Sequence, residues 1–318
     1  MTLARFTAGR VASGAIFALV VASLTMALAR AVPSAELDDL TRTPVEIAAL
    51  RAERGLDRPF LQQYAHWLAG VARLDFGTSS RFRRPVGDLL GERAANTAIL
   101  AVAALVVATG LGLSLGRRAG SAPQGAGRWI RAASLAVLSL PPLLSSLLLV
   151  FIAGRTGWLP SGGMTSGGLT GAAWLADVLR HLPVPALALG LPMAATLERL
   201  QARSMREALA RPFVTASLAR GLDREAAARV HAWPVSLAPV LGAYGVLTGS
   251  LFSGSFVVEL VTGWPGLGLL LFDALNARDV WLVAGCGAAG AASLAVGITI
   301  ADVVHAAIDP RVLEARRS

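Results

Sequence analysis

Residues 198–239 read ERLQARSMREALARPFVTASLARGLDREAAARVHAWPVSLAP and form a charged interval between two strongly apolar segments. Seven of these residues are arginines and four are acids. A charged stretch that interrupts apolar sequence in this way is typical of a polar loop on one face of a membrane. The side on which this loop lies therefore sets the topology of the segments before and after it.

The composition also indicates a membrane protein. Of the 318 residues, 54% are apolar and only 15% are charged, which is too apolar for an ordinary soluble domain. The net charge of +9 would be compatible with nucleic-acid binding, but all 29 basic residues are arginines that lie mostly beside apolar runs. That placement favours a topological origin for the charge. The one cysteine, Cys286, excludes a disulfide framework within the chain and a thiol metal cluster.

Six segments are candidates for transmembrane helices, which need about 20 apolar residues each. The predicted spans are Val11–Ala29, Ala94–Gly116, Ala132–Gly154, Leu182–Leu197, a run from near Ser236 to Glu259, and Val280–Ala301. The fourth segment is short, so it spans only if its helix continues past Glu198 with that carboxylate at the interface. Residues 156–176 lack charge but contain six glycines and Pro160, which predicts an external loop.

Prolines and glycines within the spans predict local features of the helices. Pro141-Pro142 and Pro192 are expected to kink their helices because proline removes a backbone donor. Small residues spaced four apart predict close helix packing. These are Gly112 and Gly116, Gly245 and Gly249, and members of the cluster Gly285, Gly287, Ala288, Ala289 and Gly290.

The placement of the arginines predicts the orientation. Residues 1–10, 117–131, 198–236 and 309–318 carry 16 arginines, whereas the short opposite loops carry three. By the positive-inside rule, both termini and the charged loop are expected in the cytoplasm. The first apolar segment ends in Ala27-Leu28-Ala29, which also fits a cleaved secretory signal. We favour an uncleaved anchor because a 19-residue run is long for a signal core.

Between the first two spans, the pattern becomes that of amphipathic helices outside the membrane. Thr43-Pro44-Val45-Glu46 is a capping box that predicts a helix start, and Gly55 suits the end of that helix. A second helix is predicted from Pro59, with an apolar stripe that is expected to pack on the membrane domain rather than to bind a ligand. The stripe consists of Phe60, Tyr64, Trp67, Leu68, Val71 and Leu74.

The sequence contains no pattern that predicts catalysis. Its four histidines lie in separate segments without metal-ligand spacing, and it has no phosphate-binding Gly-Lys-Ser/Thr loop. Glu198, Glu259 and Asp302 lie near span ends, whereas ion-coupled transporters usually keep an ionisable group near the membrane midplane. Uphill transport would therefore need another energy source, such as a partner ATPase.

The charged loop has the features of a short, rigid helical projection. Gly221 permits a sharp turn, and Asp223 can cap a helix from Arg224 to Val230, which we expect Pro234 to end. A helix of this kind can also lie on lipid headgroups, attracted by its arginines. Both alternatives place it at a membrane surface.

Two groups of motifs resemble bacterial ABC importer permeases of the dipeptide, oligopeptide and nickel branch. The first is the EAA-type loop, with Phe213, Ala219-Arg220-Gly221-Leu222 and the following Pro234 and Pro239. The second follows the fifth span and comprises Val258-Glu259, Trp264-Pro265-Gly266-Leu267-Gly268, Ala277-Arg278-Asp279 and Asp309-Pro310-Arg311. One departure is Leu218, where the family usually has a basic residue, and this questions how tightly the loop docks.

The resemblance implies an all-α, polytopic membrane protein of the type I ABC importer permease fold, with six transmembrane helices and a cytoplasmic EAA-type coupling helix. It implies an N-terminal transmembrane helix and extracytoplasmic segment at 1–93, a permease domain at 94–308 and a cytoplasmic tail at 309–318. The residues that it implies for coupling to the ATPase are Phe213, Arg220, Gly221, Asp223, Arg224 and Pro234. Those of the external motif are Glu259, Trp264, Pro265, Gly266, Gly268, Arg278 and Asp279. Trp264 is expected at the membrane interface, and Pro265 and the two glycines in a tight turn.

The implied function is that of an inner-membrane permease subunit, forming half of the translocation pore of an ATP-driven importer. Di- or oligopeptides are the leading solutes, with nickel and glutathione as the main competitors. The implied partners are a second homologous permease, two cytoplasmic ATPases, an extracytoplasmic solute-binding protein and membrane lipid, without nucleic acid. The resemblance implies no cofactor, no metal and no enzymatic activity in this chain. An autonomous secondary transporter or channel is the alternative, and a membrane-anchored scaffold is a third.

Overall fold

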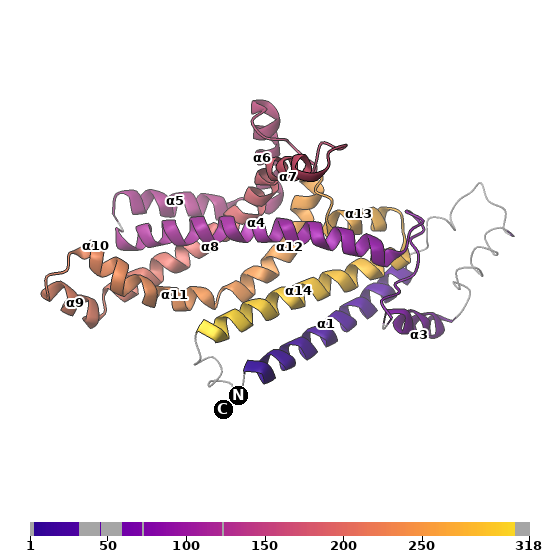
Figure 1. The fold of residues 1–318 in the computed structure, drawn as a ribbon, viewed down its shortest axis with the longest axis horizontal. Coiled ribbons are helices and arrows are strands. Elements are labelled where there is room, and N and C mark those ends of the chain that lie inside the picture. Colours follow the sequence, from indigo (N-terminus) through magenta and orange to yellow (C-terminus); the bar gives the residue numbers. More distant parts are fainter. Residues whose placement is uncertain (1–2, 32–44, 46–58, 72, 123, 309–318) are drawn as a thin grey trace. The chain divides into compact units, whose positions relative to one another are not determined.

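The computed structural model describes residues 3–31, 45, 59–71, 73–122 and 124–308 (Figure 1). Regular structure in these residues is helical, apart from an isolated bridge between Thr78 and Pro85. The chain divides into two compact units. Unit 1 comprises residues 1–9, 98–264 and 297–318, and unit 2 comprises residues 10–97 and 265–296. These units are defined by contacts between residues. The predicted division into functional segments at residues 93 and 308 stays a prediction.

The helices agree with the predicted all-α membrane fold. In chain order they are α1 (Leu3–Ala31), α3 (Phe60–Val71), α4 (Val86–Ser121), α5 (Ala126–Ser139), α6 (Pro142–Thr156), α7 (Gly171–His181), α8 (Pro183–Leu209), α9 (Pro212–Ala219), α10 (Arg224–Ala227), the π-helical turn η2 (Ala228–Ala232), α11 (Trp233–Leu241), α12 (Tyr244–Thr262), α13 (Leu267–Asn276) and α14 (Val280–Ile308). Within the described residues, α1, α4, α12 and α14 are long and apolar enough to cross a membrane. The bent pairs α5–α6 and α7–α8 raise that number from four to six if each pair is one span.

The two predicted proline kinks have different outcomes. At Pro141-Pro142 the helix does not kink but breaks, and α5 and α6 meet at 105°. Leu140 and Pro141 are extended because a residue before proline avoids the helical conformation, and Pro142 then begins α6. At Pro192, by contrast, α8 continues without a break.

Two further boundaries differ from the predicted ones. The glycine-rich external loop was expected to extend to residue 176, but α7 already begins at Gly171. The predicted fifth span is divided into α11 and α12 at Gly242. The fourth span does continue past Glu198, as α8, but the Glu198 side chain is only 1% exposed. The carboxylate is therefore enclosed by protein, and its expected depth at the membrane interface stays a prediction.

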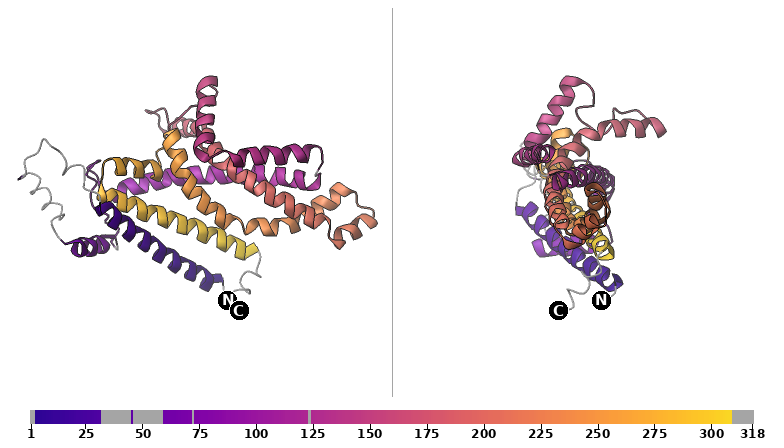
Figure 2. Two further views of the ribbon diagram at one scale, coloured as in Figure 1. Left: turned by 180° about the vertical axis from the view of Figure 1, so that it is seen from behind. Right: turned by 90° about the vertical axis from the view of Figure 1, so that its left-hand side faces the viewer.

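In unit 1, close packing of α4 on α8 confirms one of the predicted glycine pairs. A Cβ at Gly112 would lie 2.6 Å from the Leu197 Cβ, and one at Gly116 would lie 2.6 Å from the Gln201 Cβ. Only glycine therefore allows the two backbones to approach this closely. Gly249 has nothing within 4 Å of a Cβ, so the prediction of close packing there is wrong. In the turned views of Figure 2, these helices can be followed by their colours.

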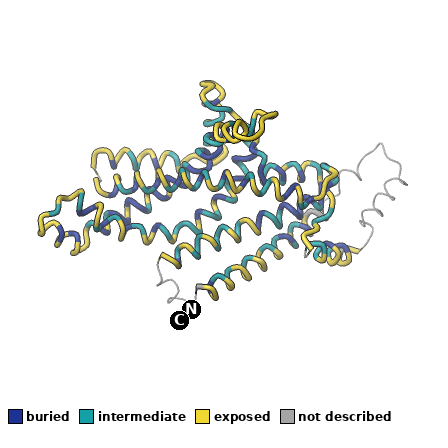
Figure 3. Tube along the Cα trace, viewed as in Figure 1, coloured by how far each residue is buried: buried dark blue, intermediate teal, exposed yellow. Residues whose placement is uncertain are grey.

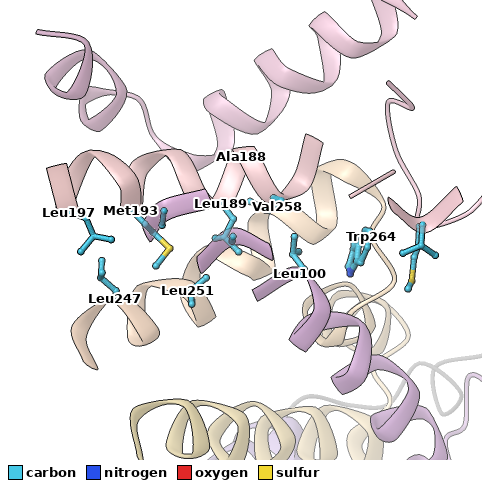
Figure 4. Close-up of a cluster of buried hydrophobic side chains, with 14 of the residues drawn as sticks. Leu100, Ala188, Leu189, Met193, Leu197, Leu247, Leu251, Val258 and Trp264 are labelled. Carbon is cyan, nitrogen blue, oxygen red and sulfur yellow. The ribbon is translucent and has the colours of Figure 1, made fainter. Parts of the chain in front are cut away.

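The core of unit 1 is a buried cluster of side chains mainly from α4, α8 and α12, together with Trp264 (Figure 4). Met193 of α8 lies beside Leu247 and Leu251 of α12, and the side chains point toward one another. Because lipid tails are as apolar as leucine, such side chains hold membrane helices together by close packing instead of by removal from water. The cluster fixes α8 and thereby supports the charged loop at its end.

In unit 2, helix α3 confirms the predicted stripe for the most part. Trp67 is buried in a cluster with Ala22, Met26, Val280 and Ala284. Tyr64 packs at the edge of this cluster, so the stripe packs on α1 and α14 as predicted. Leu74 lies beyond the end of α3 and is exposed, so its assignment to the stripe is wrong. The predicted helix between Thr43 and Gly55 lies outside the described residues.

Candidate functional site

The charged loop contains a helix, α9, that the sequence analysis did not predict. Arg211 is extended because it precedes a proline, and Pro212 then occupies the first turn of α9, where its missing N–H costs nothing. Val214 and Ser217 face inward, and the Ser217 hydroxyl donates to the Val214 carbonyl at 2.7 Å. The remaining residues of this short helix are exposed.

A tight turn at Gly221 ends α9. Gly221 has a φ of +93°. Its N–H donates to the Leu218 carbonyl at 2.9 Å, and the Leu222 N–H donates to the Ser217 carbonyl at 3.2 Å. These two bonds form a Schellman motif, which satisfies carbonyls that a helix end otherwise leaves unpaired. A Cβ at Gly221 would meet nothing within 4 Å, so glycine is required here by conformation and not by space.

The predicted cap at Asp223 is present. Its Oδ1 accepts a hydrogen bond from the Ala226 N–H at 2.6 Å, and α10 begins at Arg224. Glu225 lies in the first turn, where the helix dipole stabilises a negative charge. A cap of this kind stabilises a helix by about 1 kcal/mol. Asp223 and Arg224 both remain exposed, so the capping hydrogen bond does not bury either side chain.

Both short helices are attached to α8 by a small apolar cluster, which we call the loop cluster. It consists of the buried residues Met205, Ala208, Val214, Ala227, Ala228 and Ala232, from α8, α9, α10 and η2. Leu209, Leu222 and Trp233 pack at its edge. Because the cluster joins α9 and α10 to the end of a helix from the core of unit 1, the two helices form one rigid hairpin.

The predicted end of the helix at Pro234 is wrong. After α10 the chain continues through the π-helical turn η2, in which the Trp233 N–H bonds to the Ala228 carbonyl, and passes directly into α11. Pro234 lies in the first turn of α11 instead of beyond a helix end. A π-turn adds one residue to the helix and changes which N–H groups must donate, so the proline is accommodated without a break.

The outer face of the hairpin is exposed. Phe213 is 38% exposed and Leu218 is 36% exposed, and both lie on α9. Arg220 and Arg224 are exposed beside the Gly221 turn. Figure 3 shows this end of unit 1, formed by α9 and α10 as labelled in Figure 1, mostly in the colour of exposed residues. The structure thus brings five predicted coupling residues together on one hairpin and places Pro234 on the following helix.

In unit 1, the second motif begins at the end of α12. Glu259 and Trp264 are both fully buried, and the Trp264 N–H donates to the Glu259 carbonyl at 3.0 Å. The left-handed residue of this turn is Gly263, with a φ of +65°. Trp264 belongs to the core cluster of unit 1, so its ring packs against protein instead of being exposed as an anchor, and its depth at the membrane interface stays a prediction. Its ring is large and apolar, and the core offers it more contact than a surface position would.

In unit 2, the same motif continues into α13. Gly266 is the N-cap of α13 with a φ of −102°, and Gly268 lies within that helix. Neither glycine adopts a left-handed conformation, so the expected glycine-dependent turn at these two positions is wrong. The turn is held instead by α4: the Asn96 side chain donates to the Pro265 carbonyl at 2.8 Å, and the Leu267 N–H donates to the Thr97 hydroxyl at 2.8 Å.

Arg278 and Asp279 connect α13 to α14. Arg278 has a φ of +50°, which is uncommon for a residue with a Cβ. Asp279 is only 2% exposed. Its Oδ2 accepts from the Ser79 hydroxyl at 2.7 Å and from the Arg81 N–H at 3.1 Å. Its Oδ1 accepts from the Leu282 N–H at 3.2 Å, so this carboxylate is a buried helix cap that also fixes an extended segment.

The sequence analysis missed the residues that hold these motifs in place. Asn96 and Thr97 are uncharged polar residues at the start of the apolar run from Ala94, and this contrast is a signal that could have identified them. Ser79 lies in a segment without periodic pattern, 200 residues before its partner Asp279. Nothing in the local sequence indicates that pairing.

The site therefore consists of an exposed, rigid hairpin and two internally bonded turns. Comparison with known proteins identifies the family of the chain. Residues 108–314 match the family described as "Binding-protein-dependent transport system inner membrane component". The oligopeptide transport system permease protein OppB of Mycobacterium tuberculosis is 35% identical over 285 residues, covering 85% of this chain and 86% of the relative. The dipeptide transport system permease protein DppB of Escherichia coli is 31% identical over 293 residues, covering 85% and 86%.

A third relative extends the same relationship. The oligopeptide transport system permease protein AppB of Bacillus subtilis is 30% identical over 261 residues, covering 81% of this chain and 82% of the relative. The family match spans more than half of the chain, and the helical structure agrees with the type I ABC importer permease fold. The chain therefore belongs to the binding-protein-dependent transport system inner membrane component family, whose members are membrane permease components of ABC transporters.

Proposed function

We propose that this chain is a permease subunit of an ATP-driven peptide importer, forming half of the translocation pore with a second homologous permease. The names of its relatives, which are oligopeptide and dipeptide permease proteins, support peptides as the solute. Two cytoplasmic ATPases hydrolyse ATP, and an extracytoplasmic binding protein delivers the peptide. The chain itself is not an enzyme.

The observation that carries this proposal is the rigid hairpin of α9 and α10. A surface that transmits force must be exposed to its partner and firmly attached to the pore. The hairpin meets both requirements, since Phe213, Arg220 and Arg224 are exposed while the loop cluster attaches it to α8. We assign ATPase docking to Phe213, Arg220, Asp223 and Arg224, and the shape of the docking surface to Gly221. Pro234 contributes by its place at the start of α11.

The orientation follows from the arginines. The hairpin, both termini and residues 117–131 belong to the segments that carry 16 arginines, whereas the short opposite loops carry three. The hairpin and both termini therefore lie on the cytoplasmic side of a bacterial inner membrane. The motif from Glu259 to Asp279 then lies on the external side, toward the binding protein. Closure of the two ATPases moves the hairpins, and the pore alternates between outward and inward access.

The test is the substitution Gly221→Val in the complete importer, reconstituted in proteoliposomes with its binding protein. A β-branched residue at a φ of +93° is strained by about 1–2 kcal/mol, so the turn should open and peptide uptake should fall about tenfold or more. Membrane insertion should persist, because the site is exposed and open. ATPase stimulation by the binding protein should fall in parallel.

Gly125→Val is the matched control, because Gly125 also has a positive φ, of +61°, and open space around it. It lies outside the hairpin, so uptake should remain close to that of the wild type. Normal uptake by Gly221→Val would contradict the coupling role. Uptake by this chain alone, driven by an ion gradient without ATPases, would instead establish an autonomous transporter.

A further inference from the structure

Within unit 1, α5 packs along α8, and a pocket with a volume of about 440 Å³ lies between them. Arg131 and Leu135 of α5 line one side, and Arg199, Leu200, Arg203 and Arg206 of α8 line the other. Four arginines thus line one pocket. None of the described residues that line it carries a carboxylate.

One arginine of this lining forms an ion pair with a neighbouring acid. Arg203 pairs with Glu207 through a contact of 2.9 Å between Nε and Oε1, on the exposed surface of α8. Arg206 differs, because its Nη1 is shielded from solvent and has no hydrogen-bond partner in the structure. A shielded donor without an acceptor costs about 1–3 kcal/mol, and more when the group is charged. An acceptor oxygen in the pocket would reach this donor only if the Arg206 side chain turned toward the pocket that it lines.

The lining also has an apolar part, formed by Leu135, Leu200 and the neighbouring turn of α8. Guanidinium groups beside leucines at the cytoplasmic end of a span match the boundary between lipid headgroups and acyl chains. Arginine is suited to phosphate because its planar group donates two parallel hydrogen bonds to the oxygens. The volume is sufficient for one phosphate-bearing headgroup.

We propose that the pocket between α5 and α8 binds the phosphate of an anionic phospholipid of the cytoplasmic leaflet. The inference requires the chain to lie in a membrane with the hairpin in the cytoplasm, but it does not require the coupling role of Gly221. Its test reads lipid binding, whereas the coupling proposal is tested by peptide uptake, so the two can fail separately.

The experiment is native mass spectrometry of the full-length chain in detergent, with equal amounts of phosphatidylglycerol and phosphatidylcholine of identical acyl chains. The wild type should prefer phosphatidylglycerol by about tenfold or more, since each arginine near a headgroup contributes about fivefold. The double variant Arg199→Gln/Arg206→Gln should reduce the preference to roughly twofold or less. An unchanged preference in this variant would overturn the proposal.

Two matched variants make the result specific. Arg211→Gln/Arg229→Gln removes the same charge from exposed positions of the same loop and should keep the preference; an equal loss there would show bulk charge attraction and overturn the pocket. Arg199→Lys/Arg206→Lys keeps the charge but loses the paired hydrogen bonds, and should give an intermediate preference. Helicity measured by circular dichroism confirms that each variant is folded.

Two additions identify the source of the phosphate. Excess inorganic phosphate should not displace phosphatidylglycerol, because it lacks the acyl chains that the leucines contact. Displacement by it would assign the pocket to a soluble anion. Added ATPase subunit should also leave the lipid bound. Its release on assembly would assign the pocket to the partner protein, and either displacement would overturn the lipid proposal.

Discussion

Two turns of this chain have the same backbone plan but are built from different residues. One joins α9 to α10 through Gly221 and Asp223, and the other joins α13 to α14 through Arg278 and Asp279. In each, a left-handed residue closes a Schellman motif, and an aspartate then caps the next helix. The first uses glycine with an exposed aspartate. The second uses arginine with a buried aspartate that accepts three hydrogen bonds.

The difference shows where each turn obtains its stability. The Arg278 turn is held from outside by Ser79 and Arg81, and this support allows a residue with a Cβ to remain at a φ of +50°. The Gly221 turn has no comparable buried aspartate, since Asp223 is exposed and accepts from Ala226, within the same helix start. The shape of this turn therefore depends on glycine itself, whereas the loop cluster attaches the hairpin as a whole to α8.

The largest expected effect comes from removing the buried cap with Asp279→Ala. The Ser79 hydroxyl and the Arg81 and Leu282 N–H groups would all lose their acceptor, at a combined cost of about 3 kcal/mol or more. Thermal unfolding of the detergent-purified chain should show a clearly lower midpoint. A change as small as that expected for an exposed cap would contradict the assigned role of Asp279.

Glycine dependence gives the next largest effect. Gly221→Asn should destabilise the chain by less than about 1 kcal/mol, because asparagine tolerates left-handed backbone, whereas Gly221→Val should cost about 1–2 kcal/mol. Uptake by the reconstituted importer should follow the same order. Equal uptake by the two variants would show that docking does not depend on the conformation of the turn.

The sequence was sufficient for the hairpin turn because its determinants are local. Glycine at the end of α9 and aspartate two residues later are neighbours in the chain, so Gly221 and Asp223 could be assigned from pattern alone. The apolar runs likewise predicted α1, α4 and α14, since a membrane span depends on length and composition.

Other features depend on groups far apart in the sequence and could not be predicted from local pattern. Trp264 was expected at the interface, but its burial depends on α4, α8 and α12 forming a core around it. The Glu198 carboxylate was expected at the membrane interface, and nothing in the local sequence indicates that its side chain is enclosed by protein. Pro234 did not end its helix because the π-turn before it shifts the hydrogen bonds, and single-residue propensities do not encode that shift.

A smaller effect is expected at the exposed cap. Asp223→Ala removes the acceptor for the Ala226 N–H, which water can replace because the position is exposed, so the cost should be about 0.5–1 kcal/mol. The unfolding midpoint should fall less than for Asp279→Ala, while uptake should fall if the α10 start contacts the ATPase. Asp223→Asn, which keeps a capping oxygen, is the control and should restore stability.

The smallest effect is expected at Arg278, and its sign is opposite to the others. Arg278→Gly relieves the left-handed strain of a residue with a Cβ, but glycine also gains freedom in the unfolded chain, so the net gain should be about 0.5 kcal/mol. The unfolding midpoint should rise slightly. A lower midpoint would mean that the contacts of the Arg278 side chain stabilise the fold by more than the strain of its left-handed backbone destabilises it. Arg278 would then help to hold the turn, together with Ser79 and Arg81.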